Sequence, residues 1–398
     1  MNIAVAQSGG PTSAINASLL GVFEAAYNAD GVDRIYGSFN GIEGIIKNNL
    51  IDLTDKLSCE ENRKLLKQTP ATALGSCRYK LPDFSDDSAV YSLITENLIK
   101  NGIGAFFYIG GNDSMDTVAK LSGYMTDNNI DIKIIGVPKT IDNDLLITDH
   151  TPGFGSAAKF VATALSEIVR DSEAYDLKTV TIVEIMGRHA GWLAASSCLL
   201  HIDGGEAPHL IYLPESNFSA NKFIADIKNQ LTKRNSVIVA VSEGLELGER
   251  AASPTDGFGH TALSGVGNQL GKLVKEHINC KLRSVELSVL QRCCAHISSK
   301  TDIEEAVSIG SAAVLAALSG ETGKMMCFTR TSDSPYKVEI TTVDANKIAN
   351  GEKKFPTEWI TEDGNNVKDA AISYFLPLIE GECEQTFENG MPKHLILK

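Results

Sequence analysis

The sequence predicts an α/β protein with two doubly wound α/β/α lobes. Short apolar strands followed by a turn and a helical pattern recur, as in NIAVAQSGG before INASLLGVFEAAYN and AFFYIGGND before SMDTVAKLSGYM. After residue 150 the alternation resumes with TVTIVEIMG before HAGWLAASSCLL, and later with SVIVAVSEG. Such alternation is typical of parallel sheets covered by helices. A chain of 398 residues is long enough for about two or three domains, each with its own core.

The two halves of the chain are expected to share an interface. No Pro/Ser-rich linker and no short repeat separates them, so we expect the chain to cross between the lobes more than once. We predict one lobe from residues 1–152 plus about 293–345, and a second from about 153–292 plus 346–398. The cleft between two such lobes is the default position for an active site.

Composition and charge exclude several classes of partner. The formal net charge of −14 argues against binding to nucleic acid or to an acidic membrane, because both need basic patches that displace counterions. No apolar run approaches the roughly 18 residues of a membrane helix. The basic start of a secretory signal is also missing, so we expect no membrane partner and a cytoplasmic protein. The eight cysteines lack C-x-x-C spacing and are expected to be reduced thiols rather than zinc ligands.

Two glycine turns follow apolar strands, and each opens a helix. In SGGPTSAIN, Gly9 and Gly10 leave backbone N–H groups at a helix start, where partial positive charge favours phosphate. In GGNDSMD, Gly111 and Asp113 occupy the same kind of position. Either stretch alone could be only a tight turn, and Asp113 and Asp116 could simply complement the helix dipole. Ligands of α/β proteins bind at the carboxyl ends of such strands, so the pair favours a phosphate site, with Asp116 left as structural.

The stretch VPKTIDND, residues 137–144, places one cation beside two carboxylates. Asp142 and Asp144 could be turn formers, but they end another apolar strand and should lie at the same edge as the glycine loops. Two carboxylates there could supply a base and a magnesium ligand while Lys139 holds a phosphate. Such an arrangement suits phosphoryl transfer, in which a base with an ordinary Asp pKa near ~4 is sufficient because it accepts the proton late.

Strand ends of the second half present further polar side chains. In EIMGRHAGW, Arg188 at a glycine turn is suited to clamp phosphate or carboxylate, whereas His189 is more typical of packing. VSEGL presents Glu243, which could bind sugar hydroxyls or be a surface glutamate. LRSVELSVLQRCC contains Arg283 and Arg292, and arginines of this kind are usually surface or ion-pair groups unless other motifs support them.

These motifs together resemble the phosphofructokinase superfamily. From residue 3 to about 325 the chain contains, in order, SGGPTSAIN, GSCRY, GGNDS, PKTIDND, the GF of TPGFGSA, MGRHAG, LPE, SEG and R-x8-R. The pair of TIDND and MGR is highly specific. The resemblance implies two α/β/α lobes, the first binding a phosphoryl donor and the second binding fructose 6-phosphate, with Mg²⁺ as cofactor.

The resemblance also implies roles for individual residues. Asp142 resembles the base for the sugar 1-hydroxyl, with Thr140 beside it, and Arg188 and Lys139 act on the transferring phosphoryl group. Asp144 resembles a magnesium ligand, and Asp113 is a further candidate. The implied donor contacts are Gly9, Gly10, Arg78, Gly111, Asp113, Ser114 and Lys139. The implied sugar-phosphate contacts are Thr140, Asp142, Met186, Gly187, Arg188, Glu243, Arg283 and Arg292, with Arg283 commonly supplied by a neighbouring subunit.

Two positions differ from ATP-dependent bacterial members of the family and point to pyrophosphate as the donor. Those members have glycine where this chain has Asp113 and Lys139. An ATP α-phosphate would have to lie where the Asp113 carboxylate sits, and like charges at ~4 Å in an effective dielectric of ~20 cost on the order of 4 kcal/mol. Lys139 offers a compact cation to the concentrated charge of pyrophosphate. The adenine platform is weakened too, because Ile42 aligns with a tyrosine of the ATP enzymes.

Three positions lack the side chains that the family pattern implies. Thr179 replaces an arginine before the MGR motif and Val289 replaces a histidine before QR, so two ligands of the 6-phosphate are missing. Lys80 or a cation from the C-terminal segment is a candidate replacement. Asn112 stands where many relatives have an aspartate near the metal.

The resemblance implies a phosphotransferase of glycolysis and gluconeogenesis. It would transfer a phosphoryl group reversibly from pyrophosphate to the 1-hydroxyl of fructose 6-phosphate, giving fructose 1,6-bisphosphate and phosphate. Alternatives are an ATP-dependent 6-phosphofructokinase, the same chemistry on sedoheptulose 7-phosphate, and a non-catalytic regulatory subunit that binds sugar phosphate. A homodimer or homotetramer is expected because Arg283 would serve a neighbouring subunit.

Overall fold

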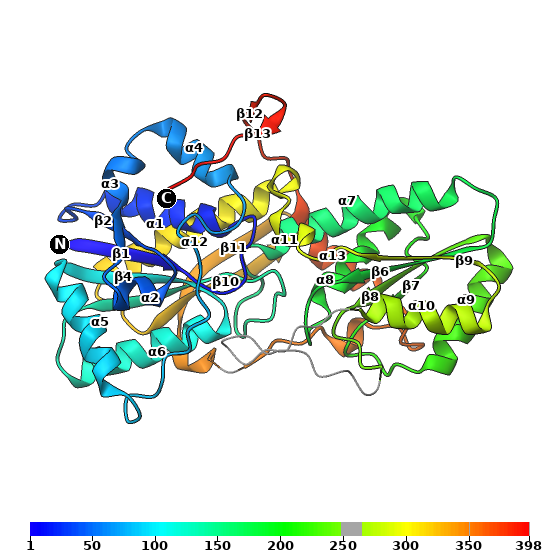
Figure 1. Ribbon diagram of the computed structural model, residues 1–398, viewed down its shortest axis with the longest axis horizontal. Coiled ribbons are helices and arrows are strands. Elements are labelled where there is room, and N and C mark those ends of the chain that lie inside the picture. Colours follow the sequence, from blue (N-terminus) through cyan, green and yellow to red (C-terminus); the bar gives the residue numbers. More distant parts are fainter. Residues whose placement is uncertain (248–264, 350, 398) are drawn as a thin grey trace.

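The first lobe is built on a seven-stranded sheet in the order β11-β10-β5-β4-β1-β2-β3 (Figure 1). The structure is a computed structural model that describes residues 1–247, 265–349 and 351–397. The inner strands run parallel and only the edge strands β11 and β3 are antiparallel to their neighbours. The strands are β1 (Asn2–Gln7), β2 (Ile35–Ser38), β3 (Leu50–Asp52), β4 (Ile103–Gly110), β5 (Lys133–Pro138), β10 (Lys324–Asp333) and β11 (Tyr336–Asp344).

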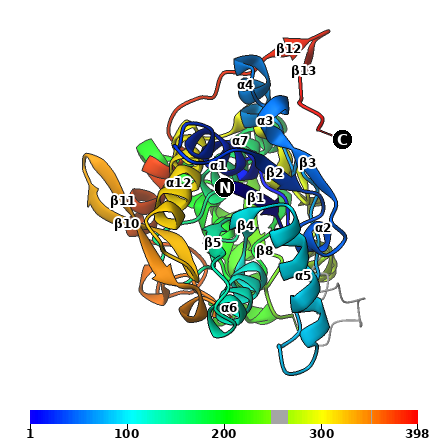
Figure 2. The same cartoon turned by 90° about the vertical axis from the view of Figure 1, so that its left-hand side faces the viewer.

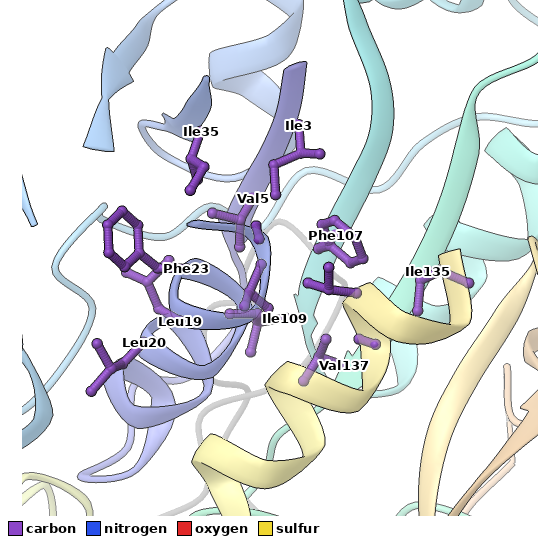
Figure 3. Packing of buried hydrophobic residues seen from close by; sticks show 14 of the residues in the cluster. Ile3, Val5, Leu19, Leu20, Phe23, Ile35, Phe107, Ile109, Ile135 and Val137 are labelled. Carbon is purple, nitrogen blue, oxygen red and sulfur yellow. The ribbon is translucent and has the colours of Figure 1, made fainter. Parts of the chain in front are cut away.

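Helices cover both faces of this sheet. Along β1 the side chains alternate, so Ile3 and Val5 enter the hydrophobic core beneath α1 while Ala4 and Ala6 enter the core on the opposite face. Figure 3 shows the first of these cores, where Leu19 and Phe23 of α1 lie against the sheet. The helices of this lobe are α1 (Ile15–Tyr27), α2 (Ile42–Ile46), α3 (Leu53–Lys56), α4 (Glu60–Gln68), α5 (Ser88–Lys100), α6 (Asn112–Asp127) and α12 (Lys300–Leu318).

Helices α1 and α12 pack directly against each other, as the end-on view in Figure 2 shows. Two glycines permit this close approach. A Cβ on Gly21 would lie 2.0 Å from the carbonyl oxygen of Val307, and one on Gly310 would lie 2.2 Å from that of Ser18. A helix from the last third of the chain thereby completes the core of the first lobe.

The second lobe contains a four-stranded parallel sheet in the order β7-β8-β6-β9. The apolar stretches TVTIVEI and SVIVAVS form its central strands and are almost entirely buried. Its strands are β6 (Thr179–Ile185), β7 (Leu210–Tyr212), β8 (Ser236–Ser242) and β9 (Lys281–Glu286), and its helices are α7 (Phe154–Glu173), α8 (Trp192–Ala195), α9 (Ala220–Lys233), α10 (Val266–His277), α11 (Leu290–Cys293) and α13 (Asp369–Phe375). The short 3₁₀ segments are Ser196–Gly204, Ala295–Ile297, Ala345–Lys347, Thr357–Trp359 and Leu376–Ile379, and a hairpin near the end pairs β12 (Phe387–Glu388) with β13 (Met391–Pro392).

The C-terminal segment packs on both lobes. Phe355 and Phe375 join Phe154 in the core of the second lobe. The chain then returns to the first lobe, where Gln68 Nε2 donates to the carbonyl oxygens of Thr386 (3.2 Å) and Lys393 (2.6 Å). The last part of the range 346–398, which the sequence assigned to the second lobe, therefore also contacts the first lobe. The lobe boundaries themselves stay a prediction.

Two expectations about the whole chain concern thiols and membranes. All eight cysteines are free thiols. Within the described residues, no helix is both long enough and apolar enough to cross a membrane.

Asp302 of α12 joins the lobes by capping α7. Its carboxylate is buried and accepts from the N–H groups of Gly153 (2.8 Å) and Ser156 (3.0 Å) and from Ser156 Oγ (2.5 Å). A helix start has N–H groups without intrahelical partners, and here an aspartate from the other lobe satisfies two of them.

We predict that Asp302→Ala lowers the free energy of unfolding by about 3 kcal/mol, because it leaves buried N–H groups without an acceptor. Chemical denaturation followed by circular dichroism measures this change. The control is Asp131→Ala, which removes an exposed ion pair with Lys133 and should leave stability almost unchanged. Equal losses in the two variants would contradict the capping role.

Candidate active site

Three loops meet at the carboxyl ends of the neighbouring parallel strands β1, β4 and β5. Lys139, directly after β5, is only 3% exposed, and its Nζ donates to the carbonyl oxygen of Gly10 (2.8 Å) in the loop after β1. Its backbone N–H donates to Gly110 O (3.0 Å) at the end of β4. The Cβ that a side chain would add at Gly111 lies 3.7 Å from Lys139 O. One lysine thus connects the loops that the sequence predicted to converge.

The loop after β1 leaves room for cations. A Cβ at Gly9 would lie 3.2 Å from Lys139 Nζ, and one at Gly10 would lie 3.3 Å from Nη1 of Arg292. The Gly9 N–H donates to Cys77 O (3.3 Å), so this N–H is not available to a phosphate, contrary to expectation. The same bond holds the GSCRY loop, and with it Arg78, beside the glycines.

Asp113 and Ser114 lie in the first turn of α6, directly after the second glycine loop. Ser114 is buried, whereas Asp113 is half-buried. Asp113 is near enough to the exposed Arg78 to act on its pKa. Partial burial lowers the pKa of Arg78. The positive charges of Arg188 and Arg292 lower this pKa further, whereas the carboxylate of Asp113 raises it. Three arginines from both lobes therefore gather at one place, which gives a strongly acidic chain a local site for anions.

Burial makes the Lys139 side chain less basic. It lowers the pKa of this lysine to about 8, while the nearby Asp142 and Asp144 carboxylates counteract the shift. The ammonium form still predominates at neutral pH. A buried cation held between carboxylates and a glycine loop is suited to bind a phosphate that enters beside it.

Asp142 and Asp144 are half-buried in the loop that follows Lys139. The Asp142 N–H donates to Oγ1 of Thr140 (3.1 Å), which keeps these two residues together. Burial raises the pKa of Asp142 to about 7, and Asp144 and Glu243 contribute. Arg188 and Lys139 oppose the rise. The Asp142 carboxylate is therefore more basic than the ordinary aspartate expected from the sequence, because it is buried beside two further carboxylates.

Glu243 organises the turn after β6. Its Oε1 accepts from the N–H groups of Gly187 (3.3 Å) and Arg188 (3.1 Å), and both of these residues have positive φ, +140° and +50°. Burial raises the pKa of Glu243 to about 6, although these two N–H groups favour its ionised form. The half-buried Met186 is held from the other side, because its N–H donates to Gln291 Oε1 (3.2 Å). The sequence offered Glu243 as a sugar ligand or a surface group; in the structure it is buried, and one of its carboxylate oxygens supports the Arg188 turn, while its role as a sugar ligand stays a prediction.

Arg283 lies apart from this group within the single chain. It is in the edge strand β9, opposite Thr181, and it forms an ion pair with Asp171 of α7. The same register places Lys281 opposite Thr179, where the family pattern would have an arginine. A cation is therefore present beside the substituted position.

The site offers oxygen ligands for a metal but no complete cage. Within residues 1–247, 265–349 and 351–397, no group of three or more His, Cys, Asp or Glu residues could hold a metal ion. Burial raises the pKa of Asp144, and Glu352 adds to the rise. Asn112 Oδ1 is buried and has no hydrogen-bond partner among these residues. A site with only a few protein oxygens is compatible with Mg²⁺, because this ion usually keeps several water ligands and binds through one or two carboxylates plus substrate phosphates.

Sequence reasoning missed the contribution of the C-terminal residues 351–355. Lys353 contacts the loop of Asp142 and Asp144, and Lys354 Nζ donates to the carbonyl oxygen of His189 (2.7 Å) next to Arg188. The only available signal was the pair of lysines in GEKKFPTEW, which matches no recognised motif.

Comparison with known proteins identifies the family. The family described as Phosphofructokinase matches residues 2–317. A pyrophosphate–fructose 6-phosphate 1-phosphotransferase of Halomonas elongata is 39% identical over an alignment of 399 positions, which covers 98% of this chain and 95% of that relative. A protein of the same name from Xanthomonas campestris is 40% identical over an alignment of 405 positions, which covers 100% of this chain and 96% of the relative.

A solved structure agrees with these relatives. The crystal structure of a pyrophosphate-dependent phosphofructokinase from Nitrosospira multiformis is similar with a TM-score of 0.90 at 38% identity, covering 100% of this chain and 96% of that one. The two-lobed fold and the resemblance inferred from the motifs are confirmed, and this chain belongs to the phosphofructokinase family.

Proposed function

We propose that this protein transfers a phosphoryl group from pyrophosphate to the 1-hydroxyl of fructose 6-phosphate, reversibly, giving fructose 1,6-bisphosphate and phosphate. Relatives at 39–40% identity over nearly the whole chain have this activity in their names. The observation that carries the proposal is the buried Lys139, whose ammonium lies between the glycine loop of the first strand and the two carboxylates of TIDND.

The donor side is formed by cations around the glycine loops. Lys139 and Arg78 would bind the two phosphates of pyrophosphate, with Gly9, Gly10, Gly111 and Ser114 lining the site. Asp113 at the start of α6 would repel the α-phosphate of ATP, since like charges at ~4 Å in an effective dielectric of ~20 cost on the order of 4 kcal/mol. The same carboxylate can assist Asp144 in holding Mg²⁺, which neutralises charge on the donor phosphates when it is bound.

The transfer needs a base and fixed positive charge. With a pKa raised to about 7, Asp142 is partly ionised at neutral pH and can accept the proton of the sugar 1-hydroxyl. As this proton leaves, the hydroxyl oxygen of the sugar bonds to phosphorus, and the P–O bond to the departing phosphate of pyrophosphate breaks. Arg188 and Lys139 stabilise the charge on the transferring group in a site where no reorientation is needed. Thr140 holds the backbone of Asp142 through its hydroxyl.

The acceptor side comes mainly from the second lobe. Met186, Gly187, Arg188 and Glu243 line it, and Arg292 reaches the glycine loop of the first lobe. Arg283 lies in the edge strand β9 and pairs with Asp171 of its own chain; its service to a neighbouring subunit in a homodimer or homotetramer is part of the proposal. Lys281, opposite Thr179, is our candidate for the missing ligand of the sugar 6-phosphate.

We also propose that the protein is cytoplasmic.

The donor proposal is tested by measuring fructose 1,6-bisphosphate formation with Mg²⁺ and fructose 6-phosphate, using pyrophosphate and ATP in parallel. We expect turnover with pyrophosphate only. Asp113→Gly should then raise kcat/KM for ATP by up to about a thousandfold, because the repulsion is removed. Asp116→Asn is the matched control, since Asp116 lies in the same helix and pairs with Lys120, and it should leave ATP unused. Comparable wild-type turnover with ATP would refute the donor assignment.

Gly244 tests the support of the Arg188 turn. A Cβ there would lie 1.5 Å from the Arg188 carbonyl oxygen, so Gly244→Ala must displace that backbone. We expect kcat/KM for fructose 6-phosphate to fall about a hundredfold, as misplacement of a positioned group by about 1 Å can do. Gly123→Ala, whose added Cβ meets nothing within 4 Å, should keep wild-type activity. Full activity of Gly244→Ala in steady-state assays would show that the turn is not part of the site.

A further inference from the structure

The backbone of Lys353 joins the two lobes at the active site. Its N–H donates to the carbonyl oxygen of Asp144 (2.7 Å) in the first-lobe carboxylate loop. Its own carbonyl oxygen accepts from the indole Nε1 of Trp192 (3.0 Å), at the start of α8 in the second lobe. A single residue after the end of β11 is therefore bonded to both lobes.

The side chain of Lys353 holds the same carboxylate loop. Its Nζ donates to the carbonyl oxygens of Asp149 (2.7 Å) and Thr148 (3.0 Å) and to Asn143 Oδ1 (3.3 Å). An ammonium has three protons to donate, and here each has an oxygen acceptor. The ammonium also lies over the ring of Trp192 at 5.0 Å, within the range of a cation–π contact.

Asn143 is the side chain of this loop that the C-terminal segment holds. It lies between Asp142 and Asp144, is fully buried, and has a φ of +54°, in the left-handed region that asparagine occupies more readily than most other non-glycine residues. Its Nδ2 donates to Tyr374 Oη (3.0 Å), and Tyr374 Oη in turn donates to Asp149 O (2.7 Å). Both ends of the Asn143 amide are thus fixed, one by Lys353 and the other by Tyr374.

The two residues after Lys353 hold the turn that carries Arg188. Lys354 Nζ donates to His189 O (2.7 Å). The Phe355 N–H donates to Glu215 Oε1 (2.9 Å), which also accepts from the N–H of Gly191 (3.0 Å). The segment 353–355 therefore contacts the loop of the proposed base and the loop of the proposed phosphoryl clamp in three consecutive residues.

We propose that Lys353 is a positioning residue for phosphoryl transfer, which holds the Asp142–Asp144 loop of the first lobe in register with the Arg188 turn of the second. This inference rests on the proposed function for its kinetic part only. It assigns a role to a C-terminal segment that lies beyond the family match at residues 2–317. It also implies that Lys353 acts on the reaction rate through the loop, without contacting the substrates.

The test uses Lys353→Met, which keeps an unbranched side chain over Trp192 but removes all three ammonium hydrogen bonds. Lys368→Met is the matched control, because Lys368 lies in the same C-terminal region and its Nζ donates to a carbonyl oxygen, that of Glu358 (2.8 Å), away from both loops. The first readout is amide hydrogen exchange of residues 140–153 in the full-length protein without substrates. The second is kcat and KM with pyrophosphate, fructose 6-phosphate and Mg²⁺.

We expect Lys353→Met to speed exchange in residues 140–153 at least tenfold while the strands of both sheets stay protected. We expect kcat to fall roughly thirtyfold, with KM for fructose 6-phosphate changed less than threefold, since misplacing the base impairs the transition state more than substrate binding. Lys368→Met should match the wild type in both readouts. Tyr374→Phe, which removes only a hydroxyl bonded to the same loop, should give the same pattern at smaller amplitude, and it provides the test if Lys353→Met does not fold.

Unchanged exchange in the loop, or a rise spread evenly over both sheets, would overturn the positioning role. So would a kcat within twofold of the wild type despite a loosened loop. The two readouts separate this inference from the proposed function. If the wild type does not use pyrophosphate, the proposed function fails, whereas faster exchange confined to residues 140–153 would still support the role of Lys353 in holding the loop.

Discussion

The hydrogen bond from Lys139 Nζ to Gly10 O is the interaction around which the site is arranged. A buried ammonium is tolerated only where oxygen acceptors and negative charge compensate its lost hydration. Here the carbonyl of Gly10 and the nearby Asp142 and Asp144 do so. This requirement fixes the glycine loop after β1 against the carboxylate loop after β5.

Charged side chains of the second lobe act on the carboxylate loop of the first lobe. Asp142 has a raised pKa partly because Glu243 approaches it from the turn after β8, and Arg188 and Lys139 limit that rise. Glu243 is in turn committed to the N–H groups of Gly187 and Arg188. The carboxylate loop and the arginine turn are therefore electrostatically coupled across the lobes. In a chain with a net charge of −14, such local arrangement is what permits an anionic substrate to bind.

Much of this arrangement could be predicted because parallel strands end at one edge of a sheet, so that SGGP, GGND and TIDND had to converge. The place of Arg283 could not, since a spacing of nine residues does not reveal that it lies opposite Thr181 in an edge strand. The raised pKa of Asp142 comes first from burial in the folded chain, with contributions from Asp144 and from Glu243, which is about a hundred residues away in sequence. The sequence did not indicate Lys353, because two of its three ammonium hydrogen bonds go to backbone carbonyl oxygens, which every sequence provides. The donor and acceptor roles of single residues stay predictions.

The most direct measurement is the affinity for pyrophosphate, by titration calorimetry with Mg²⁺ and without fructose 6-phosphate, of the wild type and Lys139→Met. A charge-assisted hydrogen bond to phosphate contributes about 1.5–3 kcal/mol, so the dissociation constant should rise at least about tenfold. Lys133→Met, at the start of the strand that ends just before Lys139, removes only a pair with the exposed Asp131 and should bind as the wild type does. Equal affinities of Lys139→Met and the wild type would contradict the central place given to Lys139.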